Sequence, residues 1–224
     1  MSHRLIITCE HAGNQVPPYW EGLFKEYREV LQSHQGWDPG AWPIAQAISA
    51  AAGAPLFGCH TTRLLIEPNR SIDNPQLFSR FSDSLSEEEK TKLINQIYLP
   101  YRQQVKTAID QLAKPVLHLS VHTFTPVWKG TPRTVDIGLL FDPTRNLEAD
   151  ISARMRRKLQ MELPDLSIRF NEPYLGIDDG FTTYLRKQFS NERYAGVEIE
   201  VKQSLIGLTY PIAASISRAL EASR

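Results

Sequence analysis

The sequence predicts an α/β fold, a three-layer αβα sandwich with a mostly parallel, mixed sheet. Apolar runs of strand length alternate with segments of helical periodicity along the chain. This alternation is typical of parallel sheets that are covered by helices on both faces. A length of 224 residues with 42% hydrophobic residues is enough for one sizeable core, so we expect a single domain over residues 1–224.

Each predicted strand is a short apolar or β-branched run, and each predicted helix repeats apolar residues at a spacing of three or four. The predicted strands lie at residues 4–9, 61–66, 115–121, 135–141 and 195–206. The predicted helices lie at residues 41–53, 84–114, 146–163 and 210–224. Pro68 stops the second strand, and Gly53 ends the first helix. Ser86 caps the second helix, which Pro100 should kink or divide.

The charge balance and the two cysteines exclude several classes of function. Lys and Arg together number 25, as do Asp and Glu, so the chain offers no basic field for nucleic acid or anionic membrane. No window approaches the length of a membrane span, and the first apolar run is too short for a secretory segment. Cys9 and Cys59 form no metal-type pair and are expected in the core. We therefore expect a cytoplasmic protein whose partner is a small molecule, with its oligomeric state left open.

Polar residues collect where the predicted strands end. They are His11, Asn69 and Arg70, His122, and Asp142 after four of the strands, and Glu198 and Glu200 within the last. If the strands are parallel, several of these ends meet at one edge of the sheet. Two His, one carboxylate or amide and a separate Glu compose a hydrolytic zinc site, in which the ion lowers the pKa of a bound water to about 7. An Arg at that edge would bind a substrate carboxylate through paired hydrogen bonds.

Several of these residues also have a structural interpretation. His118 alternates with His122 along one strand, and we interpret His118 as a core histidine. For His122 itself, the strand pattern fits a ligand and a structural role equally. Glu198 and Glu200 share one face of their strand, where one of them could pair with Lys202.

Six segments, in order, resemble the signature blocks of the N-formylglutamate amidohydrolase family. They are TCEHAGNQVPP, HQGWDPGAWPIA, TTRLLIEPNRSID, VHTFTPVWKGTPRTVDIGLLFD, NEPY and VEIEVKQSLI. The resemblance spans nearly the whole chain. It implies a phosphorylase/hydrolase-like fold, shared with zinc carboxypeptidases and with the aspartoacylase and succinylglutamate desuccinylase group. It also implies hydrolysis of an N-acyl amino acid, in the name-giving case N-formyl-L-glutamate to formate and L-glutamate.

The resemblance also implies a metal site, for which zinc is the first choice. The related zinc acylases carry an H-x-x-E motif after the first strand and a second His after a later strand. The matching positions here are His11 with Asn14, and His122. Asn14 departs from the motif, because an amide oxygen is a poorer zinc ligand than a carboxylate. Asn14 could bind weakly, Glu10 or Asp38 could supply the charge, or the metal could differ; Asp38 also fits a turn before the first helix.

The remaining roles are carried over from the same relatives. Arg63 would polarise the scissile carbonyl group, and Asn69 with Arg70 would hold the substrate α-carboxylate. Glu200 would be the general base, with Glu198 as second choice.

Tyr174, in the NEPY segment, completes the expected substrate-binding residues. Two other functions stay open. One is hydrolysis of another small N-acyl amino acid or a short peptide. The other is a non-catalytic carboxylate-binding protein in which Arg63 and Arg70 hold a ligand, an interpretation favoured by the missing carboxylate at Asn14.

Overall fold

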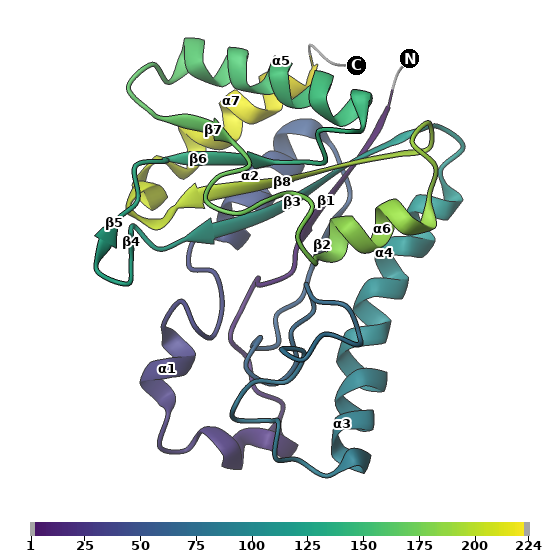
Figure 1. Ribbon diagram of the computed structural model, residues 1–224, viewed down its shortest axis with the longest axis vertical. Coiled ribbons are helices and arrows are strands. Elements are labelled where there is room, and N and C mark those ends of the chain that lie inside the picture. The colour runs from purple at the N-terminus through teal and green to yellow at the C-terminus, as the bar shows by residue number, and fades with distance from the viewer. Residues whose placement is uncertain (1–2, 222–224) are drawn as a thin grey trace.

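The computed structural model describes residues 3–221 and has the three-layer architecture that the sequence predicts (Figure 1). Its main sheet has six strands in the order β2-β1-β3-β8-β6-β7. The strands are β1 Arg4–Cys9, β2 Leu56–Gly58, β3 Val116–Phe124, β6 Ile137–Leu140, β7 Ile168–Phe170 and β8 Tyr194–Lys202. The pairs β1–β2, β1–β3, β3–β8 and β6–β7 are parallel, and only the β6–β8 pair of this sheet is antiparallel. The mixed, mostly parallel sheet is confirmed.

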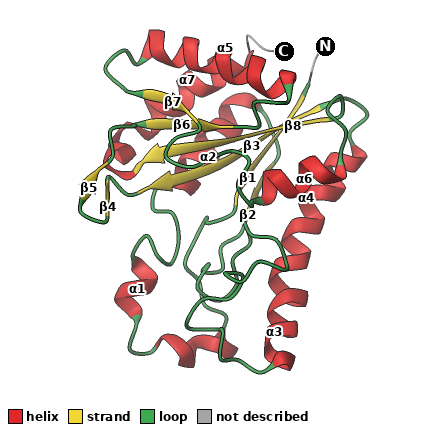
Figure 2. Cartoon of the chain, in the orientation of Figure 1, coloured by secondary structure: helices red, strands yellow, loops and turns green. Residues whose placement is uncertain are grey.

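Helices cover both faces of this sheet (Figure 2). The helices of the described chain are α1 Arg28–Gln32, α2 Ala41–Ala52, α3 Glu87–Leu93, α4 Leu99–Gln111, α5 Asn146–Glu162, α6 Phe181–Gln188 and α7 Thr209–Glu221, of which α1 and α3 lie away from the sheet. Helices α2, α5 and α7 share one apolar cluster with the sheet, whereas α4 and α6 share a second cluster with it. A small hairpin of β4 Val127–Trp128 and β5 Thr131–Pro132 follows β3. The last three residues of the predicted helix 210–224 lie outside the described residues.

The alternation of side chains along β3 positions polar groups on one face of the sheet. Leu119 and Val121 point into the cluster with α2, α5 and α7. Because successive side chains point to opposite faces, His118, Ser120 and His122 lie on the face that α4 and α6 cover. The parallel register pairs His122 with Glu200 of β8 and Ser120 with Glu198, so both Glu side chains share that face.

The predicted strand at residues 61–66 is wrong. These residues form turns, and only Thr61 makes an isolated bridge, to Gln15. The apolar side chains of the segment are buried in a third cluster below the sheet, with residues of α3 and of the 3₁₀ turn Pro18–Phe24. Packing in this cluster replaces strand pairing, and β2, which the sequence did not predict, forms the edge of the sheet.

The helix boundaries follow the predicted local chemistry. Gly53, with φ of 60°, ends α2 in the left-handed conformation that glycine adopts at low cost. Ser86 caps α3 in a reciprocal capping box with Glu89. The interruption expected at Pro100 takes the form of a π turn, Ile94–Tyr98, between α3 and α4. A wider turn accommodates a proline that lacks the N–H of a regular helix.

Within residues 3–221, no helix combines the length and the apolar character needed to cross a membrane.

Candidate metal and hydrolase site

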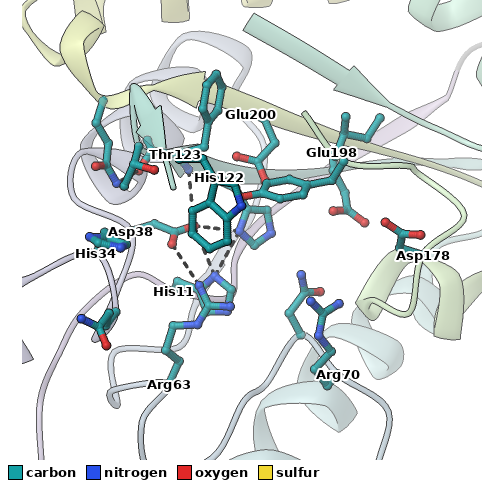
Figure 3. A pocket seen from close by; sticks show the side chains of 18 of the residues that line it. His11, His34, Asp38, Arg63, Arg70, His122, Thr123, Asp178, Glu198 and Glu200 are labelled. Atoms are coloured by element: carbon teal, nitrogen blue, oxygen red, sulfur yellow. Dashed lines mark hydrogen bonds and ion pairs between the residues drawn. The ribbon is translucent and has the colours of Figure 1, made fainter. Parts of the chain in front are cut away.

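The carboxyl ends of β1 and β3 bring two histidines together (Figure 3). His11 follows β1 by two residues, and His122 lies near the end of the neighbouring parallel strand β3. Asp38, in the loop before α2, reaches the same point, where its backbone N–H donates to the His11 carbonyl group at 3.1 Å. The three side chains are buried, so they form a compact group at the edge of the sheet.

Three atoms of this group face one another. The Nδ1 atoms of His11 and His122 are 3.2 Å apart, and Asp38 Oδ2 lies 3.2 Å from the first and 3.0 Å from the second. Within the described residues, these three side chains are the group of His, Cys, Asp and Glu that could hold a metal ion. Two imidazole nitrogens and one carboxylate oxygen form the donor set of a hydrolytic zinc site.

The opposite nitrogen of each ring contacts a second carboxylate. His11 Nε2 lies 2.5 Å from Glu67 Oε1, and His122 Nε2 lies 3.0 Å from Glu10 Oε2. Ser120 and Tyr101 donate hydrogen bonds to the Glu10 carboxylate. Such carboxylates commonly fix the orientation and tautomer of a metal-binding histidine.

This pattern of contacts tests whether the residues fit a metal. Each Nε2 needs a proton for its carboxylate, so hydrogen bonds alone leave the two Nδ1 lone pairs facing each other unless one ring, His11 or His122, takes up a second proton and becomes a buried imidazolium. With a cation between the Nδ1 atoms, each Nε2–H can donate to its carboxylate while each Nδ1 lone pair binds the ion. The residues present therefore fit a divalent metal.

The electrostatics of the group are those of buried carboxylates held by positive charge. Burial raises the pKa of Glu10, but its hydrogen bond to His122 and the His122 charge hold that pKa well below its usual range. Burial likewise raises the pKa of Asp38, but the charges and hydrogen bonds of His11 and His122 hold this pKa far below its usual range. Burial also raises the pKa of Glu67, but the charge of Arg63 is the main effect that holds this pKa well below its usual range. These three carboxylates are therefore ionised at neutral pH.

His122 shows the complementary effect. Burial lowers the pKa of its imidazole, but hydrogen bonds from the ring to Asp38 and Glu10 hold the pKa well above its ordinary value. In the metal-free site, His122 is therefore protonated on both ring nitrogens, and a metal ion must displace one of these protons.

Glu200 is a buried carboxylate beside this group. Its Oε2 is buried and has no hydrogen-bond partner within residues 3–221. Burial, together with the charges of Asp38 and Glu198, raises the pKa of Glu200 to about 8 against the opposing effect of the His122 and Arg63 charges. Lys202 does not neutralise it, because Lys202 Nζ pairs with Asp136 at 2.7 Å.

Glu198 occupies a different environment on the same strand. Its Oε1 accepts a hydrogen bond from the Thr182 hydroxyl, and the register pairs its residue with Ser120 rather than with His122. Glu198 is shown beside Asp178 in Figure 3, whereas Glu200 is shown above His122.

Arg63, predicted to polarise the carbonyl group, and Asn69, predicted to bind the substrate, lie on one loop, because the expected strand at residues 61–66 is not formed. Arg63 Nε donates to Glu67 at 2.7 Å, and Arg63 Nη1 lies 3.3 Å from Asp38 Oδ1. Asn69 Oδ1 accepts a hydrogen bond from the Phe181 N–H at 2.7 Å, which joins this loop to the start of α6.

Arg70 comes from the same loop. Its Nη1 donates to the Asp179 carbonyl group, which aims the guanidinium at the loop before α6. The backbone carbonyl of Arg70 is held by Tyr98 and Arg102 of the adjoining helical segments. The loop that carries Arg70 is therefore fixed by contacts on both sides.

These residues surround one cavity of about 590 Å³, within the size range of small-molecule sites. The cavity is lined by His11, Asp38 and His122, together with Arg63, Asn69, Arg70, Glu198, Glu200 and Tyr174. Phe124, Trp128 and Leu175 contribute apolar surface. The cavity combines a metal-type group, an unpaired carboxylate and arginines in one space, which suits hydrolysis of a small carboxylated substrate.

Three residues singled out from the sequence do not join this group. Asn14, expected as a metal ligand, does not line the cavity, and its Nδ2 donates to the Leu31 carbonyl group at 2.9 Å. His118 is a core histidine, since both ring nitrogens have hydroxyl partners at 2.7 Å. Asp142 lies away from the cavity because β6 runs antiparallel to β8.

The sequence interpretation missed several contributors. The sequence patterns gave no role to Glu67, yet its carboxylate contacts both His11 and Arg63. Trp128 lies in a hairpin that no periodicity marked. The segments that hold these residues were within the signature blocks, which was the one available signal for them.

Comparisons with known proteins show which family the chain resembles. The family model described as N-formylglutamate amidohydrolase matches residues 3–207. The gene product Atu2144 from Agrobacterium tumefaciens has a similar structure, with a TM-score of 0.82 and 27% identity over 99% of this chain and 92% of that chain. The comparison with curated proteins gives no match.

Two further structures are more distant. The N-acetylmuramoyl-L-alanine amidase AmiC2 of Nostoc punctiforme has a TM-score of 0.42 and 11% identity, over 98% of this chain and 96% of that chain. A metallo-carboxypeptidase from Burkholderia cenocepacia has the same TM-score and identity, over 100% of this chain and 58% of that chain. Likeness at this level is too low to support conclusions about the site.

The raised pKa of Glu200 predicts a pH-dependent stability of the metal-free protein. An acid whose folded pKa is raised contributes full stability below its unfolded pKa, near 4.3, and loses that contribution as pH rises through its folded value of about 8. Glu200→Gln stays neutral throughout. In EDTA, we expect its melting temperature to match wild type at pH 5 and to exceed it by at least about 2 °C at pH 8.5. Glu198→Gln, whose parent carboxylate has a hydroxyl partner, serves as the control and should show no such gain; equal pH profiles for wild type and Glu200→Gln would contradict the prediction.

Proposed function

The chain belongs to the N-formylglutamate amidohydrolase family, hydrolases that act on amide C–N bonds, and from that premise we propose that it is a metal-dependent enzyme that cleaves a small N-acyl amino acid. N-formyl-L-glutamate, giving formate and L-glutamate, is the first candidate substrate. The observation that carries the proposal is the convergence of His11 Nδ1, His122 Nδ1 and Asp38 Oδ2 beside the unpaired carboxylate of Glu200. The direct test is formate release from N-formyl-L-glutamate by purified, metal-loaded protein.

In this proposal, His11, His122 and Asp38 hold one divalent ion, zinc in the first place. Asp38 is preferred to Glu10 and Asn14 because its Oδ2 faces both Nδ1 atoms, whereas Glu10 contacts His122 on the Nε2 side. When bound, the ion supplies Lewis acidity and a water whose pKa is lowered to about 7.

Glu200 then acts as the general base and acid of the reaction. It accepts the proton of the attacking water and transfers it to the leaving amine nitrogen, which balances the cleavage of the C–N bond. Its free Oε2 and its register opposite His122 support this role. Glu198, which accepts a hydrogen bond from Thr182, is less suited.

Arg63, Asn69 and Arg70 would position the substrate. The Arg63 guanidinium stays charged beside Asp38 and Glu67, which suits stabilisation of the oxyanion that forms on the substrate carbonyl oxygen. Asn69 and Arg70 would hold the α-carboxylate by hydrogen bonds from one fixed loop. Tyr174 would close the same cavity from the opposite wall.

A second candidate substrate class is a larger N-acyl amino acid or a short peptide. A cavity of about 590 Å³ offers more space than a formyl group requires, and this observation favours the second class. Rates with N-formyl, N-acetyl and N-succinyl derivatives of L-glutamate, compared as kcat/KM, would separate the two.

The proposal includes a cytoplasmic location and a soluble small molecule as the partner.

The first functional prediction concerns the metal. Asp38→Asn should weaken the binding of one equivalent of divalent ion by more than about 100-fold, because an amide replaces the anionic ligand. Metal content after dialysis, measured by elemental analysis, is the readout. Asn14→Ala is the matched control and should retain one ion per chain; a variant set in which Asn14→Ala loses the ion and Asp38→Asn keeps it would assign the ligand to Asn14.

The second prediction concerns the base. Glu200→Gln keeps the shape of the side chain but cannot accept a proton, so kcat should fall by about 10² to 10⁴ while metal content is unchanged. Glu198→Gln should retain a kcat within about tenfold of wild type. If the two effects are exchanged, Glu198 is the base, and full activity in both variants would reject the mechanism.

The third prediction concerns the α-carboxylate. Arg70→Lys should raise KM for the best N-acyl amino acid by at least about tenfold with a smaller effect on kcat, because an ammonium cannot reproduce the paired hydrogen bonds of a guanidinium. Steady-state kinetics measure the split. An unchanged KM would remove Arg70 from the substrate site.

A further inference from the structure

Arg133 is an arginine enclosed by the aromatic wall of the cavity. It follows the β4–β5 hairpin directly, and its guanidinium carbon lies 5.3, 5.3 and 5.2 Å from the ring centroids of Phe124, Trp128 and Tyr174. All three rings line the cavity of the proposed site. Arg133 therefore lies immediately behind the cavity wall.

The hydrogen bonds of Arg133 are incomplete. Its Nη2 donates to the Tyr174 hydroxyl at 3.2 Å, whereas its Nη1 is buried and has no partner within residues 3–221. No ion pair joins Arg133 to a carboxylate of that part of the chain. Contacts with ring faces attract the charge but do not satisfy an N–H, and a buried donor without a partner is costly. A carboxylate from outside the chain would satisfy both the charge and the donor.

The arginines that line the cavity leave one carboxylate of an acidic substrate without a cation. Arg63 is occupied by Glu67 and Asp38, so Arg70 is the lining arginine left for a substrate carboxylate among the described residues. An acidic N-acyl amino acid carries two carboxylates. Asp178 and Glu198 lie beside each other in the cavity lining (Figure 3). There, the second substrate carboxylate would be repelled by both side chains and would have no cation to pair with.

Two of the three rings in front of Arg133 are partly exposed. Tyr174 is 41% exposed and Trp128 is 49% exposed, in contrast to the buried Phe124. Rotation of either ring therefore gives up less buried surface than rotation of Phe124 would. A carboxylate can thus replace the Tyr174 hydroxyl and reach the guanidinium.

We propose that Arg133 binds the side-chain carboxylate of the substrate, so that the enzyme selects N-acyl amino acids with acidic side chains over their neutral counterparts. The inference rests on the proposed function. In this arrangement Arg70 binds the α-carboxylate on one wall, and Arg133 binds the side-chain carboxylate behind the aromatic wall. The two guanidinium groups then fix both ends of the amino-acid part while the N-acyl bond meets the metal group.

The test compares N-formyl-L-glutamate with N-formyl-L-glutamine, which has nearly the same shape but a neutral side chain. For wild type, kcat/KM should favour the glutamate derivative by about 10- to 100-fold, the value of a hydrogen bond between charged groups. Arg133→Met should bring this ratio close to one by raising KM for the glutamate derivative, with the glutamine derivative changed less than about threefold. Because each preparation is measured with both substrates, partial unfolding does not alter the ratio.

Arg156→Met is the matched control. Arg156 also stacks on an aromatic ring, with its guanidinium carbon 4.4 Å from the Phe170 centroid, but neither residue lines the cavity of the proposed site. This variant should keep the wild-type ratio. Equal losses for both substrates in Arg133→Met, or an unchanged ratio, would overturn the inference and leave Arg133 as a support for the rings.

The outcomes also separate this inference from the proposed function. If wild type cleaves both derivatives at similar rates, the amidohydrolase function stands and the role of Arg133 fails. If wild type cleaves neither, the proposed function fails, and calorimetric binding of L-glutamate against L-glutamine still tests Arg133. Preferential binding of L-glutamate that disappears in Arg133→Met supports the carboxylate site, whereas equal binding rejects it.

Discussion

The contact of two imidazole nitrogens and one carboxylate oxygen is the constraint on which the rest of the site depends. The Nδ1 atoms of His11 and His122 are 3.2 Å apart, and Asp38 Oδ2 faces both of them. Because both Nε2 atoms face carboxylates, hydrogen bonds alone leave the two Nδ1 lone pairs facing each other unless one ring becomes a buried imidazolium. A cation between them resolves this conflict, and the carboxylates at the two Nε2 atoms then have donors of the correct tautomer.

The fold meets this constraint by placing charged groups in layers around the two rings. Glu10 and Glu67 hold the outer sides of the histidines, and Arg63 bridges Glu67 and Asp38. Buried carboxylates are costly unless they are paired and hydrogen-bonded. Glu200 differs from the others because one of its oxygens has no partner. Unlike the carboxylates that hold the histidines, it is available to exchange a proton.

The cavity joins two parts of the chain with different structural origins. The sheet supplies the histidines and Glu200 from parallel strands whose register is fixed by backbone hydrogen bonds. Loops packed on the third apolar cluster supply Arg63, Asn69 and Arg70, while the hairpin and the NEPY segment supply the aromatic wall. Placement of the reacting groups by the sheet and of the binding groups by loops is a common division in α/β enzymes.

The sequence by itself determined the layers and the strand ends. Strand and helix periodicities are local properties, so the αβα class, the caps at Gly53 and Ser86, and the shared face of Glu198 and Glu200 were predictable. The segment 61–66 shows the limit, because its β-rich composition is equally compatible with burial in a cluster of loops. Local propensity cannot distinguish strand pairing from such packing.

Only the tertiary structure decided which polar groups meet. Asn14 matched a motif spacing, yet Asp38, 27 residues from His11 along the chain, faces both rings. Glu67 and Arg133 had no local signal, because their surroundings come from segments far apart in sequence. The antiparallel direction of β6 likewise removed Asp142 from the group. Side-chain partners depend on register, strand direction and loop packing, which are set by long-range burial and not by the residues next along the chain.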